Sequence, residues 1–308
     1  MLHMPWMVKA QIGVALLLPL IAFAVFCGCG EHRIVALPSV KVALEPEYPL
    51  HIMAERYNEL MSYLGNATKR RVEWISAISS ESMIATIEAR KPDIALVDPL
   101  HYVILRKTCG AEPLLKVLLQ SPSGTRAGGE VRESTRGVII AHADEAKPGL
   151  HELEGSVVAV PSRQLLFGFV AHIKTCKDAG VDWRSARFVV ERREDRVVAA
   201  VALGRAKFGF IREGTLELLS GIIDLSKVRE ASKTYPYPNP CFVCLPDVLR
   251  RRKKIVMELK EALLKLNEPS PENKRILSLA GWAGITEEVS DKEYDVVRQL
   301  LTELNLPY

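Results

Sequence analysis

Three consecutive polar residues, Ser162, Arg163 and Gln164, have side chains that could together hold an anion. They lie between an apolar run at 156–160, which predicts a strand, and a segment at 164–179 that predicts a helix. Free backbone amides and the helix dipole at such a junction favour an anion. Ser162 could cap the helix and donate its hydroxyl, Arg163 could offer a two-pronged fork, and Gln164 could add an amide. The alternative is that Ser162 only caps and Arg163 is solvated.

Asp98 and Tyr102 follow another apolar run, at 93–97. If Ser162, Arg163 and Gln164 face a ligand cleft, Asp98 and Tyr102 would project into that cleft from the other half of the molecule. Because a carboxylate repels an anion, Asp98 would suit an amine-bearing or zwitterionic ligand, or an ion pair with Arg163. The structural alternatives are an N-cap for a helix that begins at Pro99, and core packing for Tyr102.

Tyr48 and Arg212 complete the set of candidate ligand-binding residues. Tyr48 lies in the turn after the first predicted strand and could stack on a ligand or hydrogen-bond to it. Arg212 follows a predicted strand at 207–211 and could reach the cleft. Loop packing and a surface salt bridge are the alternatives.

The chain carries none of the common catalytic motifs, neither a nucleophile elbow nor a zinc-binding helix nor a phosphate-binding Gly-rich loop. Cys241 and Cys244 have the spacing of a metal knuckle, but no second pair follows and the surroundings are apolar, which favours a buried strand. The seven histidines are scattered singly, at His3, His32, His51, His101, His142, His151 and His172. We therefore expect no catalytic residue, no metal and no cofactor.

The first thirty residues have the character of an export signal. Lys9 is the only charged residue there, and an apolar run precedes Cys27 and Cys29. The small residue before Cys29 predicts a lipoprotein signal peptide at 1–28, with Cys29 lipidated and a tether at 29–39. Cys27 is the alternative processed cysteine, and a membrane-spanning anchor is the alternative interpretation of the run. Both place the rest of the chain outside the cytoplasm.

Composition favours a folded body of about two domains. The 308 residues are 48% hydrophobic and 25% charged, and the net charge of +4 is not gathered into a basic tract, so no nucleic acid partner is expected. Apolar strands alternate with amphipathic helices over 40–97, and the pattern restarts at 137 after a polar, loop-like stretch at 121–129. We predict an α/β fold in which 40–136 and 237–308 form one lobe and 137–236 form the other.

Several segments of the sequence resemble segments that occur in the same order in the phosphate/phosphite/phosphonate-binding proteins of ABC transporters. They are residues 81–102, 137–140, 150–159 and 198–204, and the Pro-rich turn before Cys241. The resemblance covers about 40–300. It implies a two-lobed type II periplasmic-binding fold, a ligand held in the cleft between lobes, and delivery to an ABC transporter permease. We expect a monomer that is anchored to the membrane by the lipid on Cys29.

The chain departs from this family at the ligand site. Where relatives often carry a Ser-Thr-Ser-Gly-like run, residues 161–168 keep only Ser162, and Glu194 and Lys207 stand where the family often shows His and Asp. Ligand identity therefore does not transfer. The expected function is capture of a small oxyanion such as phosphate, phosphite or a phosphonate. The alternatives are a ligand-sensing lipoprotein coupled to a membrane kinase, and a degenerate scaffold that has lost transport.

Overall fold

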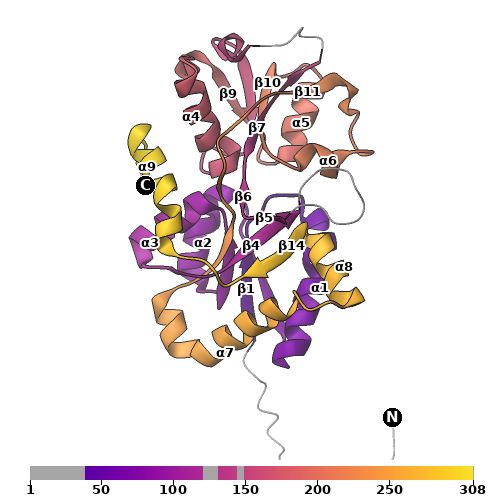
Figure 1. Ribbon diagram of the computed structural model, residues 1–308, viewed down its shortest axis with the longest axis vertical. Coiled ribbons are helices and arrows are strands. Elements are labelled where there is room, and N and C mark those ends of the chain that lie inside the picture. The colour runs from indigo at the N-terminus through magenta and orange to yellow at the C-terminus, as the bar shows by residue number, and fades with distance from the viewer. Residues whose placement is uncertain (1–38, 121–130, 144–148, 308) are drawn as a thin grey trace, which may run out of the picture. The chain divides into compact units, whose positions relative to one another are not determined.

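Figure 1 shows the computed structural model of the chain, which describes residues 39–120, 131–143 and 149–307. The predicted signal peptide, the predicted lipidation site Cys29, nearly all of the predicted tether and the predicted loop at 121–129 lie outside the described residues. Within the described part, no helix is both long and apolar enough to cross a membrane.

The first lobe, lobe 1, is built on a seven-stranded mixed sheet. Its order is β14-β4-β13-β3-β1-β2, with β5 paired to β4 at one end. β1 runs parallel to β2 and β3, whereas β13 is antiparallel to both β3 and β4. The strands are β1 (Val40–Leu44), β2 (Val72–Ser76), β3 (Ile94–Val97), β4 (Glu112–Gln120), β5 (Val131–Arg132), β13 (Cys241–Cys244) and β14 (Trp282–Thr286).

Among the described residues, six α-helices belong to lobe 1, and α1 packs on both α7 and α8 while α3 contacts α2 and α9. They are α1 (Leu50–Thr68), α2 (Met83–Arg90), α3 (Pro99–Cys109), α7 (Pro246–Lys265), α8 (Pro271–Ala280) and α9 (Asp295–Glu303).

The second lobe, lobe 2, has a five-stranded sheet of order β11-β7-β10-β8-β9. Alternate residues of β7 point to different apolar clusters: Ile140 packs under α5, and Ile139 packs with the cluster that includes α4. Helices therefore cover both faces of this sheet. The elements are β7 (Gly137–His142), β8 (Val157–Val160), β9 (Arg187–Val190), β10 (Phe208–Arg212), β11 (Val228–Lys233), α4 (Ala171–Asp178), α5 (Glu194–Ala202) and α6 (Thr215–Leu219).

Two short segments connect the lobes and lie side by side. β6 (Ser134–Thr135) leads into lobe 2, β12 (Tyr237–Pro238) leads back, and the two pair antiparallel (Figure 1). Next to them the Thr135 hydroxyl donates to Asn239 Oδ1 at 2.6 Å, and Asn239 Nδ2 donates to the Val117 and Arg132 carbonyls. The connection is thus anchored on lobe 1, and a rotation of lobe 2 would bend the chain around this pair.

The structure differs from the sequence-based expectation in two places. The strands β4, β11 and β14 were not predicted, because each is defined by a partner far away in the chain. The helix expected from Gln164 instead begins as a π-helical turn, η3 (Leu166–Val170), that continues into α4. Gly168 permits this turn, since a Cβ there would lie 2.9 Å from the Pro161 ring.

Candidate functional site

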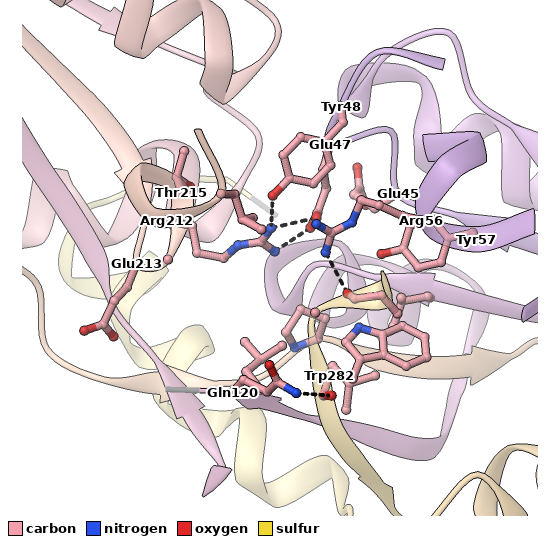
Figure 2. A pocket seen from close by; sticks show the side chains of 18 of the residues that line it. Glu45, Glu47, Tyr48, Arg56, Tyr57, Gln120, Arg212, Glu213, Thr215 and Trp282 are labelled. Atoms are coloured by element: carbon pink, nitrogen blue, oxygen red, sulfur yellow. Dashed lines mark hydrogen bonds and ion pairs between the residues drawn. The ribbon is translucent and has the colours of Figure 1, made fainter. Parts of the chain in front are cut away.

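A cavity of about 250 Å³ lies between the lobes (Figure 2). Lobe 1 lines it with residues from the β1–α1 turn, α1, β4 and β14, and lobe 2 lines it with the end of β10 and the start of α6. At its edge Arg132 of lobe 1 forms an ion pair with Glu213 of lobe 2. The loops and turns that face this cavity therefore come from both sheets, as ligand sites of two-lobed α/β proteins do.

Arg212 is the central cation of the site. Its Nη1 and Nη2 donate to the two carboxylate oxygens of Glu47 at 2.6 and 2.7 Å, and Nη2 also donates to the Tyr48 hydroxyl at 3.2 Å (Figure 2). The Arg212 side chain is only 15% exposed. Burial alone would lower the pKa of Arg212, but Glu47, Tyr48 and Glu194 together outweigh it and raise the pKa well above its usual value. Burial raises the pKa of Tyr48 to about 12, so its hydroxyl keeps its proton.

Glu194, the first residue of α5, holds the backbone at this point. It accepts a hydrogen bond from the Arg212 amide at 2.9 Å and another from the Thr215 hydroxyl. Burial raises the pKa of Glu194 despite the nearby Arg212 charge. The Glu194 carboxyl therefore ties the end of β10 to the start of α6.

Asp98 reaches from lobe 1 to the start of the π-helical turn in lobe 2. Its Oδ1 accepts from the Leu100 amide at 2.8 Å, as an N-cap of α3 does, and from the Leu166 amide at 3.0 Å. The helix start that the sequence predicted as an anion site is thus occupied by a carboxylate of the same chain.

Ser162 of lobe 2 is also hydrogen-bonded to a carboxylate of lobe 1. Its hydroxyl donates to Glu81 Oε1 of lobe 1 at 2.5 Å and accepts from the Gln164 amide at 3.1 Å. Ser162 is 1% exposed. It therefore caps its own turn and also joins the two lobes.

Three of the hydrogen-bonded contacts between the lobes run in the same direction. In each, a carboxylate of lobe 1, from Glu47, Glu81 or Asp98, accepts from a donor of lobe 2. The space left among them is about 20 Å³, enough for roughly one water. A bound oxyanion would offer these donors the same kind of oxygen. The lobes are therefore closed on a donor set that the chain's own carboxylates already satisfy.

Arg163, Gln164 and Tyr102 lie away from the cavities. Arg163 and Gln164 are exposed, and the Arg163 guanidinium lies over the rings of Phe169 and Phe188 at 5.7 and 5.4 Å. The Tyr102 hydroxyl donates to Asp291 at 2.6 Å inside lobe 1. Because η3 starts two residues later than expected, the side chains at 163 and 164 point outward from the turn rather than toward lobe 1.

Other site residues were not singled out from the sequence. Glu47, Glu81, Arg56 and Trp282 form walls of the site or close it, and Glu45 is buried beside them. The signal available for two of them is the Glu-Pro-Glu-Tyr run after the first strand, which places two carboxylates beside Tyr48.

No group of three or more His, Cys, Asp or Glu side chains is arranged to hold a metal ion in the part of the chain that the structure describes. Cys241 and Cys244 are buried on β13 and have free thiols. Burial raises the pKa of each thiol to about 12, so neither is a thiolate at neutral pH.

Comparison with known proteins agrees with this architecture. Residues 42–294 match the family model of the periplasmic substrate-binding protein of phosphonate ABC transporters. A Prochlorococcus marinus protein solved with methylphosphonate is 17% identical with a TM-score of 0.74, over 87% of this chain and 98% of that one. A binding component of a Pseudomonas aeruginosa phosphonate transporter is 15% identical with a TM-score of 0.73, over 85% of each chain.

A third solved relative, from Xanthomonas citri and bound to ATP, is 14% identical with a TM-score of 0.64, over 87% of this chain and 97% of that one. At these identities the solved structures establish the fold, and they confirm the predicted two-lobed periplasmic-binding fold. The match of the family model over most of the chain also confirms the predicted resemblance. The chain belongs to the family of periplasmic substrate-binding proteins of phosphonate ABC transporters, which bind a small solute and pass it to a permease.

Proposed function

We propose that this chain captures a phosphonate-type oxyanion on Arg212, between its two lobes, and delivers it to the permease of an ABC transporter. The bidentate contact of Arg212 with Glu47 carries this proposal. The two Glu47 oxygens stand in for two oxygens of the ligand, because a guanidinium binds carboxylate and phosphonate with the same fork geometry.

Opening of the lobes would free the donors for a solute. Glu47, Glu81 and Asp98 all belong to lobe 1, so rotation about β6 and β12 withdraws them together from Arg212, Ser162 and the Leu166 amide. The solute then binds to lobe 2, and closure places the Tyr48 hydroxyl beside it. Closure on the internal carboxylates competes with closure on the solute. Only open molecules can bind, so the apparent Kd equals the intrinsic Kd divided by the fraction of molecules that are open.

The test is a titration of the purified protein with phosphate, phosphite, methylphosphonate and larger phosphonates, followed by calorimetry and by the melting temperature. Binding to the folded state adds about 2.7 kcal/mol of stability at a hundredfold excess over Kd. We expect at least one phosphonate to bind and to raise the melting temperature. If no member of the series does so, the proposal is wrong and the sensor or scaffold alternatives gain weight.

Glu47→Gln is expected to bind the same phosphonate about tenfold more tightly. A neutral amide offers Arg212 one acceptor oxygen instead of two, and a hydrogen bond to a charged group contributes about 1.5 kcal/mol or more, which corresponds to about tenfold. It also removes a negative charge next to the incoming oxyanion. Glu287→Gln is the matched control, because Glu287 is exposed and pairs with Lys260 away from the cleft. Equal affinities in wild type and both variants would contradict the competition.

We further propose that the body is anchored by a lipid on Cys29 at the periplasmic or extracellular face, acts as a monomer and performs no catalysis. The export signal and the alternation of strands and helices support this, with 40–136 and 237–308 moving as one lobe and 137–236 as the other. Mass spectrometry of the mature N-terminus identifies the processed cysteine and its lipid.

A further inference from the structure

We propose that the solute is a phosphonate with a bulky, mainly apolar substituent that ends in a neutral hydrogen-bond donor, and that this substituent fills the 250 Å³ cavity. The inference rests on the proposed function, because it takes Arg212 as the anchor of the oxyanion. It adds the chemical class of the group attached to phosphorus.

The position of the cavity follows from the Arg212–Glu47 pair. Both residues line two spaces, one of about 20 Å³ beside Asp98 and one of about 250 Å³ toward β14. An oxyanion that replaces the Glu47 carboxylate on Arg212 has almost no room on the Asp98 side. Its carbon substituent must therefore extend into the larger space.

One side of the larger space is apolar and well supported. The Trp282 ring lies 5.9 Å from the Tyr57 ring, and its other neighbour, Phe242, meets it edge-on at 5.8 Å. Trp282 is 3% exposed, so the wall is fixed before any ligand arrives. Figure 2 shows Trp282 across the cavity from Tyr48. Leu96, Val97, Val117, Leu119, Pro240 and Leu218 complete this apolar side, while polar and charged residues, among them Gln120, Arg132, Glu213 and Glu217, line the rest.

Methyl and hydrogen substituents would leave this space filled with water against apolar walls. A ring or branched chain removes that surface from water, at about 25 cal/mol per Å² of apolar area. The shape and lining therefore favour a large substituent over the small one of methylphosphonate.

Glu45 is the reason for placing a hydrogen-bond donor on the substituent. It is 5% exposed, its Oε2 contacts His101 Nδ1 at 2.8 Å, and its Oε1 is buried without any hydrogen-bond partner among the described residues. A buried acceptor left unpaired is costly, and an N–H or O–H of the ligand would satisfy it. Because Glu45 also lines the cavity, the substituent can reach it.

The charges around Glu45 favour a neutral donor over an ammonium group. Burial opposes the charged form of His101, yet the carboxylates of Glu45, Asp98 and Glu81 together outweigh this and raise the pKa of His101, so the imidazole favours its positive form beside Glu45. Arg56 also lines the cavity and donates to the Ala280 carbonyl at 2.6 Å. The positive charge of Arg56 repels a cationic substituent.

The test is calorimetry of the purified protein with methylphosphonate, benzylphosphonate and (4-hydroxybenzyl)phosphonate at pH 7.5. Affinity is expected to rise in this order, by tenfold or more from the methyl to the benzyl compound and by a further severalfold with the hydroxyl. If methylphosphonate binds as tightly as the benzyl compounds, the inference is overturned while the proposed function stands. If none of the three binds, both fail.

Two variants locate the substituent. Leu218→Asn changes an apolar residue at the cavity rim that is 45% exposed, and Leu203→Asn makes the same change at a residue that is 70% exposed and lines neither space. Leu218→Asn is expected to weaken benzylphosphonate about fivefold and to spare methylphosphonate, whereas Leu203→Asn changes neither affinity. Trp282→Leu is expected to cost the benzyl compound at least tenfold, with the melting temperature as the check on folding. Equal losses for methyl and benzyl compounds would place the substituent elsewhere.

Discussion

Arg212→Gln is expected to weaken phosphonate binding by at least a hundredfold. The guanidinium is mostly buried and makes two parallel hydrogen bonds to a carboxylate, the arrangement that an oxyanion would inherit. Hydrogen bonds to charged groups contribute about 1.5–3 kcal/mol each, so loss of the pair exceeds the 2.7 kcal/mol that corresponds to a hundredfold. Calorimetry with the tightest-binding phosphonate of the series measures the change.

Arg163→Gln is the matched control for this variant. Arg163 is an exposed arginine of lobe 2 that lies on the rings of Phe169 and Phe188 and lines neither space. Its replacement should change affinity by less than about twofold, as exposed charges do. A large loss in Arg163→Gln with none in Arg212→Gln would return the anion site to the run at 162–164 and overturn the site described here.

Asp98→Asn is expected to change how stability depends on pH. Burial raises the pKa of Asp98 from 3.8 to about 6, although the His101 charge opposes it. The folded protein therefore binds a proton that the unfolded chain releases, so stability is highest below about pH 4 and falls as pH rises toward and through 6. The raised pKa of His101 acts in the same direction at higher pH. The Asp98 shift corresponds to about 3 kcal/mol.

The measurement is the free energy of unfolding by urea between pH 4 and 8. The amide introduced by Asp98→Asn would keep an oxygen for the Leu100 and Leu166 amides without a buried charge, so the variant should be more stable than wild type at pH 7.5 and similar at pH 4. Asp224→Asn is the control, since Asp224 caps a short helix in the same way but is fully exposed. Parallel pH profiles for wild type and Asp98→Asn would show that Asp98 does not titrate in this range.

Two residues of lobe 2 hold the closed arrangement together at the end of β10. Glu194 anchors the backbone, and Arg212 supplies the positive charge. Their contacts span β10, α5 and α6, so the backbone around the cation is fixed by several elements of lobe 2.

Much of the fold was accessible from the sequence because its signals are local. The buried run of β3, the Asp98-Pro99 start of α3 and the amphipathic helices depend on neighbours within a few residues. The same local phrases carry the family resemblance. Strands such as β14 were missed because a short segment with Ala and Gly becomes a strand only through its pairing with β4, more than 150 positions earlier.

By itself, the sequence determined the two-lobed α/β class, the family, and the presence of Tyr48, Asp98, Ser162 and Arg212 among the polar residues that end strands or begin helices. Only the tertiary structure decided which of these donors meet which carboxylates. Contacts such as Arg212 with Glu47 and Ser162 with Glu81 join residues 165 and 81 positions apart, and they depend on lobe closure. A strand end specifies where a side chain starts, but its partner is set by the facing lobe.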